Sequence, residues 1–350
     1  MNTIELGDSR ELLKKVATKS VQSIYFDPPF NSNRKYRLTS DDESIGFDDI
    51  FASDDEYVSL VEPMVRECAR ILKKDGSFFF HISADQMLIP SMICSKFFRR
   101  VQPIFWKRSR SKNNIKTKLG ACTDVIFWCS HVEKPKFNMV YQPLDSYYAE
   151  NSYKNKDARG NYALGHICYT KTQAPDKSKS DRYYEICKDG VWYEPKYGWR
   201  MSKDNLQQLI DDDRIHFPKN KPKIKIKTGS INLLSPAKKI ISKANPYKKI
   251  YAHESKGKPS TDYWDDLHSI AMGSEERVYP TQKPVALMKR IIEMSTDVGD
   301  TILDPVAGAG TTGVAASLLD RNYIMFDISE DAIEACKRRI KNEGKNLTTV

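Results

Sequence analysis

The stretch Val21-Gln22-Ser23-Ile24-Tyr25-Phe26-Asp27-Pro28-Pro29-Phe30 sets the organisation of the chain. Its apolar first part predicts a buried strand of a parallel sheet. Pro28 and Pro29 end that strand, because neither can donate a backbone hydrogen bond to a neighbour. A carboxylate, two carbonyl groups and an aromatic ring therefore follow the carboxyl end of a strand, where open α/β sheets bind ligands. The alternative is a Pro-rich turn whose Asp caps a helix.

The composition favours an intracellular protein with an anionic partner. Its 350 residues suffice for two domains, or for one domain with a large insertion. The net charge of +10 favours nucleic acid as the partner. We expect neither a membrane span nor a signal peptide, because no stretch approaches the ~18 consecutive apolar residues of a span. Seven cysteines without a C-x-x-C pair argue against zinc and disulfides, so we expect reduced thiols and no metal site.

Acidic residues follow two strands of the predicted sheet. Asp8 ends the short strand 4–7 and can cap the next helix, and Asp27 ends strand 21–26. Because both strands belong to one βαβ unit, we expect the two carboxylates at the same edge of the sheet. For Asp8, a plain helix cap is the alternative.

Two further segments flank this core. The polar segment 31–55 has no clear periodicity and predicts a long, flap-like loop. The stretch 101–106 predicts an edge strand because it contains Pro103, and 125–129 predicts its hairpin partner.

Basic residues mark two candidate DNA contacts. The first is the loop that carries Lys107, Arg108 and Arg110, for which a solvated charge run is the alternative. In the second, lysines alternate with other residues, so a strand would put their ammonium groups on one face, where they could contact a nucleic-acid backbone. A solvated edge strand protected from aggregation is the alternative. These lysines are Lys221, Lys223, Lys225 and Lys227.

A glycine-rich turn dominates the C-terminal part. Strand 301–303 leads into Asp304 and then into Gly308-Ala309-Gly310-Thr311-Thr312-Gly313, which matches G-x-G-x-x-G and opens a helix. Asp327 ends the next strand, where an acid can bind ribose hydroxyls. Taken alone, this pattern predicts a nicotinamide-dinucleotide site and a dehydrogenase.

A nucleoside without a pyrophosphate fits the chain better. No second βαβαβ half follows the turn, and a dehydrogenase gives Asp27–Phe30 no role. S-adenosylmethionine fits: Asp327 suits its ribose, Asp8 its adenine, and the glycine turn its methionine part.

The two motifs together resemble the amino-directed DNA methyltransferases. Asp27-Pro28-Pro29-Phe30 and the turn from Asp304 to Thr312 carry the likeness, which extends to Gly7-Asp8, 262–267 and 279–284. The order, with the catalytic tetrapeptide first and the glycine turn last, resembles the permuted β group. One departure is Val306, where the family usually has Phe, which affects packing over the cofactor.

The resemblance implies a fold and a set of domains. It implies a Rossmann-like, doubly wound α/β domain of the class I methyltransferase type, built from 1–136 and 263–350. The insert 137–262 would be the target-recognition domain. The implied catalytic residues are Asp27, Pro28, Pro29 and Phe30, and Trp106 is a candidate base-stacking residue. The implied cofactor-binding residues are Asp8, Thr281, Lys283, Asp304, Gly308, Gly310, Thr311, Thr312 and Asp327.

The implied reaction is methyl transfer from S-adenosylmethionine to adenine N6 in double-stranded DNA. The Asp27 carboxylate and Pro28 carbonyl would accept the amino hydrogens, which directs the nitrogen lone pair at the methyl group. The base must first be flipped out of the duplex. Cytosine-N4, an RNA or protein amino group, and a catalytically dead DNA-binding module remain alternatives. A homodimer and a separate restriction subunit are left open.

Overall fold

The computed structural model describes residues 2–38, 45–109, 119–218, 240–242, 244–270 and 275–344. Contacts divide the chain into two units. The catalytic unit combines Met1–Gln142 with Pro259–Val350, so both ends of the chain build it. The insert unit is Pro143–Lys258. The insert expected from the sequence was 137–262.

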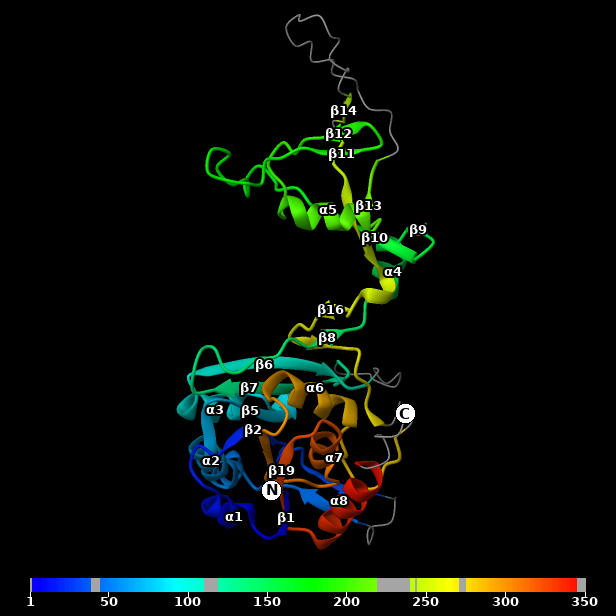
Figure 1. The fold of residues 1–350 in the computed structure, drawn as a ribbon. Coiled ribbons are helices and arrows are strands. Elements are labelled where there is room, and N and C mark those ends of the chain that lie inside the picture. Colours follow the sequence, from blue (N-terminus) through cyan, green and yellow to red (C-terminus); the bar gives the residue numbers. More distant parts are fainter. Residues whose placement is uncertain are drawn as a thin grey trace, which may run out of the picture. The chain divides into compact units, whose positions relative to one another are not determined.

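An eight-stranded sheet forms the centre of the catalytic unit in the described part of the chain (Figure 1). The strand order is β1-β19-β18-β2-β5-β7-β6-β17, and only β7 runs antiparallel to its neighbours. The strands are β1 (Thr3–Leu6), β2 (Val21–Phe26), β5 (Leu72–Ser83), β6 (Arg100–Lys107), β7 (Thr123–Ser130), β17 (Tyr263–Trp264), β18 (Thr301–Asp304) and β19 (Asn322–Asp327).

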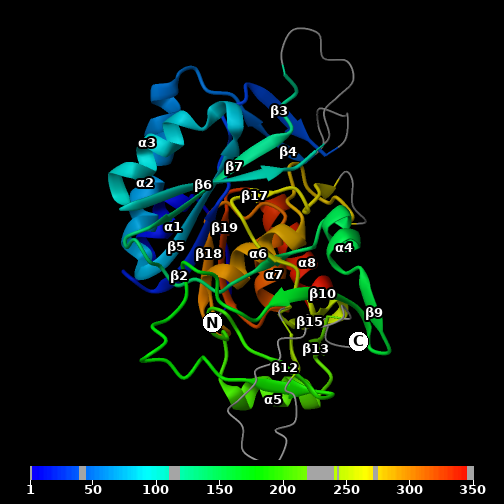
Figure 2. The same cartoon turned by 90° about the horizontal axis from the view of Figure 1, so that it is seen from above.

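Helices cover both faces of this sheet (Figure 2). One face carries α1 (Ser9–Lys15), α2 (Asp54–Ile71) and α3 (Leu88–Phe97), which bury a core with β2 and β5. The other face carries a second core, formed with α6 (Val285–Ser295), α7 (Thr311–Leu318) and α8 (Glu330–Glu343). The Rossmann-like, doubly wound fold predicted from the sequence is confirmed.

Local chemistry fixes where the helices begin. Asp8 accepts from the backbone N–H of Arg10 and caps α1, and Ser329 caps α8 through the N–H of Ala332. These caps satisfy N–H groups that have no partner inside the helix. Each cap follows a sheet strand after one intervening residue, so the caps also fix the edge at which side chains after β1 and β19 lie.

Two sequence-based expectations are wrong. The polar segment 31–55 is not a plain loop, because β3 (Arg34–Arg37) and β4 (Gly46–Asp49) pair within it as a hairpin. Strand β6 is not an edge strand, because Tyr263 and Trp264 of β17 pair with Phe105 and Trp106. Pro103 itself lies outside that short pairing, which is how a proline is accommodated. The remaining elements of this unit are η1 (Ala84–Gln86) and β8 (Tyr141–Gln142), which pairs with β16 (Lys258–Pro259).

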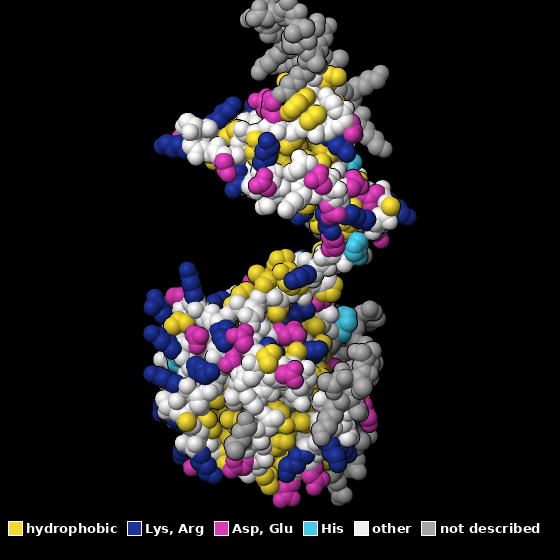
Figure 3. All heavy atoms as spheres, in the orientation of Figure 1, with side chains coloured by type: hydrophobic (Ala, Val, Ile, Leu, Met, Phe, Trp, Pro, Cys, Tyr) yellow, Lys and Arg dark blue, Asp and Glu magenta, His cyan; other side chains and the backbone are white. Residues whose placement is uncertain are grey.

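The insert unit has its own small core. A four-stranded and a three-stranded sheet pack around Trp199, Leu206 and Ile215. On the face drawn in Figure 3, basic and acidic side chains of this unit are interspersed. Its elements are α4 (Ser146–Ser152), β9 (Asn155–Asp157), β10 (Gly160–His166), β11 (Ile186–Lys188), β12 (Val191–Tyr193), α5 (Lys203–Asp211), β13 (Ile215–His216), β14 (Ile240–Ser242), β15 (Tyr247–Tyr251) and η2 (Ala252–Glu254).

Within the described residues, no helix combines the length and apolarity that crossing a bilayer requires.

Candidate active site

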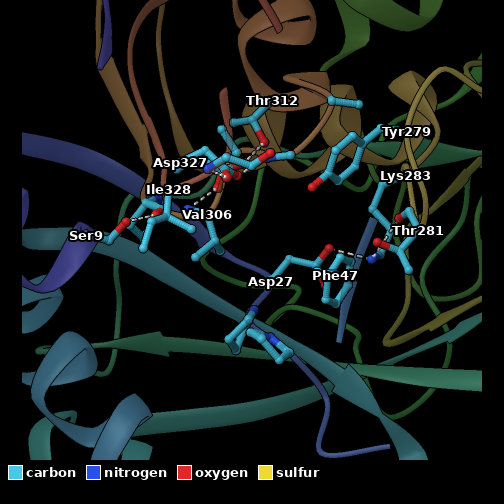
Figure 4. A pocket seen from close by; sticks show the side chains of 18 of the residues that line it. Ser9, Asp27, Phe47, Tyr279, Thr281, Lys283, Val306, Thr312, Asp327 and Ile328 are labelled. Atoms are coloured by element: carbon cyan, nitrogen blue, oxygen red, sulfur yellow. Dashed lines mark hydrogen bonds and ion pairs between the residues drawn. The ribbon is translucent and has the colours of Figure 1, made fainter. Parts of the chain in front are cut away.

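One cavity of about 510 Å³ brings the two motifs of the sequence together (Figure 4). Strands β2 and β18 are parallel neighbours, so the segments that follow them emerge side by side. Asp27–Pro29 therefore lines the same cavity as Pro305–Ala309, although the two are far apart in sequence. The sheet topology alone produces this meeting, at the edge where open α/β sheets bind ligands.

The glycine turn is held in shape by the acid that ends β19. Gly308 and Gly310 have φ values of +48° and +72°, a backbone region that favours glycine. The N–H of Gly308 donates to Asp327 Oδ2 at 2.8 Å, and the N–H of Ser329 donates to Oδ1 at 2.9 Å. Burial raises the pKa of Asp327, and these backbone donors oppose the rise. Asp327 thus supports the turn from inside while lining the cavity.

A second buried carboxylate fastens the start of α7. Thr312 Oγ1 donates to Asp304 Oδ2 at 2.6 Å, and the N–H of Val306 donates to Oδ1 at 3.1 Å. Burial raises the pKa of Asp304 to about 7. Thr311 Oγ1 donates to the carbonyl of Lys283 at 3.1 Å, which ties the turn to the segment before α6.

Asp27 has a different environment. Its Oδ2 accepts from the ammonium group of Lys283, and its Oδ1 is buried without a hydrogen-bond partner among the described residues. Nδ1 of His81 lies 3.7 Å from Oδ1. The ammonium nitrogen also lies 5.3 Å from the ring centroid of Phe30. Figure 4 shows Asp27 and Lys283 facing each other at the cavity wall.

A buried polar network supports Asp27 from behind. The Tyr25 hydroxyl and His81 Nδ1 form a hydrogen bond of 2.6 Å, and His81 Nε2 lies 3.3 Å from Asp124 Oδ2. Burial raises the pKa of Tyr25. Burial also opposes ionisation of Asp124, but the hydrogen bond with His81 and the charges of His81 and Arg108 hold the pKa of Asp124 below its ordinary value. Tyr25, His81 and Asp124 are all buried, so they form a fixed layer of side chains on which Asp27 packs.

Asp49 on β4 holds the segment that follows the two prolines. It accepts from the backbone N–H groups of Phe30, Asn31 and Ser32 at 3.0, 2.8 and 3.1 Å, and from the Ser32 hydroxyl at 2.6 Å. The side chain is 1% exposed. A buried carboxylate with four donors is well satisfied, so it fixes the position of Phe30 through the backbone.

Sequence reasoning missed several of these residues. Asp49 and Phe47 lie in the hairpin that was read as a loop, and Phe47 lines the cavity. Ile328 also lines the cavity and is 73% exposed; its position directly after a strand-ending acid was the available signal. Tyr279 lines the cavity from the stretch 279–284, in which only Thr281 and Lys283 had an assigned role. His81, for which the sequence carries no signal of a role at the site, contacts Asp27 and Phe30 of the tetrapeptide directly.

Most predicted site residues line the cavity, and a few do not. The lining includes Asp8, Asp27, Pro28, Pro29, Thr281, Lys283, Asp304, Gly308, Thr311, Thr312 and Asp327. Phe30 packs against His81, and Gly310 is the turn residue that directly precedes α7; neither is among the residues that line the cavity. Asp8 is engaged by Arg10, whose hydrogen bond lowers the pKa of Asp8.

The structure contradicts the assignment of Trp106 as a base-stacking residue. Its side chain is 2% exposed within the core, and its indole N–H donates to the carbonyl of Leu267 at 2.8 Å. A ring enclosed in this way offers no free face to a base, so the base-stacking assignment was wrong.

Most of the residues predicted to contact DNA lie outside the described residues. Lys107 is exposed, and Arg108 donates to Asp124 at 2.8 Å. Arg110 and the four alternating lysines, Lys221, Lys223, Lys225 and Lys227, lie outside the described residues.

Known proteins match nearly the whole chain. Residues 21–338 match the family described as DNA methylase. The Type II methyltransferase M.EcaI of Enterobacter cloacae is 26% identical over 93% of this chain and 65% of its own length. The StyLTI Mod subunit of a Type III restriction-modification enzyme from Salmonella typhimurium is 24% identical over 94% of this chain and 52% of its own length. The DNA adenine methyltransferase YhdJ of Escherichia coli is 26% identical, over 97% of this chain and 82% of its own length. The chain thus spans only part of the length of the first two.

Proposed function

We propose that this chain, which belongs to the DNA methylase family, transfers a methyl group from S-adenosylmethionine to the N6 amino group of adenine in double-stranded DNA. The observation that supports this best is the shared cavity, which Asp27 and the glycine turn both line. Amino-group methylation needs a donor and an acceptor site within bond-forming reach of each other. A dehydrogenase would leave Asp27–Phe30 without a role.

The cavity suits S-adenosylmethionine in size and lining. Its volume of about 510 Å³ lies within the ~300–1,000 Å³ of small-molecule sites. Asp327 at the end of β19 can accept from ribose hydroxyls, and the exposed side chain of Ile328 offers an apolar face to an adenine ring. Gly308 permits close approach because it has no side chain. When bound, the cofactor supplies an electrophilic methyl group.

The acceptor end is built for an exocyclic amine. Such a nitrogen is a poor nucleophile, since its lone pair is delocalised into the ring. We propose that the Asp27 carboxylate and the Pro28 carbonyl accept its two hydrogens and direct the lone pair toward the methyl group. The negative charge of Asp27 stabilises the positive charge that grows on nitrogen. Phe30, held by Asp49, offers its ring to the extruded base.

Adenine N6 is favoured over cytosine N4 by the Asp at the first position of the tetrapeptide and by the name of YhdJ, a DNA adenine methyltransferase. Cytosine N4 is the second candidate, because both amino groups present two hydrogens to the same acceptors. The names of other relatives favour a role in restriction-modification.

The insert 137–262 is proposed as the target-recognition region, with the basic residues of 107–110 and 221–227 contacting the DNA backbone. A homodimer and a separate restriction subunit are further possible partners. Action on DNA implies an intracellular location.

The experiment is transfer of a tritium-labelled methyl group from S-adenosylmethionine to duplex DNA, single-stranded RNA and protein. We expect label in duplex DNA, and its loss in Asp27→Ala. Calorimetric titration with S-adenosylmethionine and with NAD separates the dehydrogenase alternative. Unimpaired transfer by Asp27→Ala, or binding of NAD alone, would refute the proposal.

A further inference from the structure

In the described structure, the ammonium group of Lys283 occupies the place on Asp27 where we propose that the target amine binds. The ammonium group of Lys283 donates to Oδ2, and both side chains are largely buried, at 12% and 16% exposure. The other oxygen, Oδ1, is buried and lacks a partner among the described residues. Oδ2 is therefore the oxygen that an incoming amine can reach, and a nitrogen with three donor hydrogens already sits on it.

We propose that Lys283 is a displaceable positioning residue, whose ammonium group pairs with Asp27 before the target base enters and then yields Oδ2 to the target amine. The proposal rests on the proposed function and adds a step to it, the exchange of one N–H···O hydrogen bond for another. It also moves the main role of Lys283 from the cofactor to the acceptor base.

The burial of Asp27 explains why its carboxylate needs a counterion before the target base enters. A largely buried carboxylate without a partner is strongly disfavoured, and it takes up a proton instead of staying charged. No other cation fills this role among the described groups that face Asp27. His81 from β5 lies 3.7 Å away and is engaged by the Tyr25 hydroxyl.

The remaining groups near Asp27 are acids or hydroxyls. Asp304 of β18 and Tyr57 of α2 each feel the charge of Asp27, and Asp124 of β7 lies behind His81. Each of these is neutral or negative. Lys283 is thus the cation that pairs with Asp27.

The reaction explains why the counterion must leave. Positive charge grows on the acceptor nitrogen, and a second cation on the same oxygen would oppose it. Lysine suits this exchange, since a flexible four-carbon stem carries its charge. The ammonium nitrogen also lies 3.4 Å from the Thr281 carbonyl, a partner that it can keep when the amine takes Oδ2. Displacement therefore need not leave the ammonium group without partners.

The test is the pH profile of kcat/KM for methyl transfer to duplex DNA, measured for the unchanged protein, Lys283→Met and Lys283→Arg. Lys283→Met removes the charge and keeps the length, so Asp27 holds a proton more strongly and the acidic limb of the profile moves to higher pH. Low on that limb, at a pH below both apparent pKa values, we expect about a tenfold loss, the equivalent of a one-unit move of the limb. Near pH 9 the variant should recover to within about threefold of the unchanged protein.

Lys283→Arg should keep the acidic limb in place. Lys289→Met is the matched control, because Lys289 lies in α6, close to Lys283 in sequence, but does not line the cavity; this variant should leave the profile unchanged. Calorimetry should give affinities for S-adenosylmethionine within about threefold in all variants.

Two results would overturn the proposal. Lys283→Met with an unmoved acidic limb and weakened cofactor binding would make Lys283 a cofactor ligand. A loss that persists to high pH would mean that Lys283 must stay on Asp27 during transfer.

A measurement without turnover separates this inference from the proposed function. Lysine labelled with nitrogen-15 at Nζ should give one protected ammonium signal that disappears in both Lys283→Met and Asp27→Asn. A signal unaffected by Asp27→Asn would show that the pair is absent in solution, and would refute the inference. An unchanged protein that transfers nothing to DNA would instead refute the proposed function, while the signal still tests the pair.

Discussion

Two aspartates at the ends of neighbouring strands have opposite environments. Asp304 ends β18, is 3% exposed, and accepts from Thr312 and the backbone of Val306. Asp27 directly follows β2, and it has one oxygen on the Lys283 ammonium group and one without a partner in the described structure. The first accepts from neutral donors, whereas the second is paired with a cation beside the cavity. Asp304 thus shapes the turn, whereas Asp27 lines the cavity and has an oxygen that is held by an exchangeable cation.

Replacing Asp27 should have the largest effect on activity. Asp27→Asn keeps the size of the side chain but removes the charge that stabilises the acceptor nitrogen. We expect methyl transfer to fall by about 10²–10³-fold, as for other lost electrostatic contacts, with cofactor affinity little changed. Single-turnover kinetics and calorimetry measure the two. Asp85→Asn, an exposed residue of η1, is the control. Equal losses of affinity and rate would place Asp27 in cofactor binding instead.

Replacing Asp304 should change how stability depends on pH. Burial raises the pKa of Asp304 from 3.8 to about 7, so the folded chain keeps a proton that the unfolded chain loses between these values. The resulting contribution is complete below about pH 4 and is lost as the pH rises through about 7. Relative to Asp304→Asn, the unchanged protein should lose about 2–4 kcal/mol of unfolding free energy between pH 4 and 8. Urea unfolding measures this, and parallel pH curves would contradict it.

Substitution of Gly310 in the glycine turn should have the next largest effect, a loss of stability. A Cβ on Gly310 would lie 2.8 Å from Cα of Cys336, and φ is +72°. Gly299 has a similar φ of +83°, but a Cβ there would meet nothing within 4 Å. Gly310→Ala should therefore cost about 2–3 kcal/mol, and Gly299→Ala about 1 kcal/mol. Thermal unfolding compares them, and equal losses would mean that backbone strain alone matters.

Asp49 should have the smallest of these effects, because it acts on the base only through the backbone. Asp49→Asn replaces one acceptor oxygen by a donor and weakens the hold on Phe30 and Ser32. We expect about a tenfold loss of kcat and a loss of about 1–2 kcal/mol of unfolding free energy, with cofactor affinity nearly unchanged. Asp55→Asn, exposed on α2, is the control. A loss of stability without a loss of kcat would make Asp49 purely structural.

The sequence predicts the fold and the meeting of its two motifs well, for a physical reason. Strand period, proline and glycine are local signals, so β2 begins and ends as expected, at Val21 and Phe26. Parallel strands bring their carboxyl ends to one edge, which is why Asp27 and Gly308 could be expected together.

The partners of those residues could not be predicted. Lys283, His81 and Asp49 reach the tetrapeptide from distant segments, and no local pattern encodes such contacts. The hairpin of Asp49 consists of two four-residue strands, too short for a clear period. Trp106 was misread because the covering strand β17 comes from far along the chain.

The central claim, transfer of a methyl group to adenine N6 at Asp27, is tested most directly by mass spectrometry of nucleosides. Duplex DNA is incubated with the protein and S-adenosylmethionine that carries a deuterated methyl group, and is then digested. We predict deuterated N6-methyladenine with the unchanged protein and none with Asp27→Ala. Deuterated N4-methylcytosine would contradict the base assignment, and equal labelling by Asp27→Ala would contradict the claim itself.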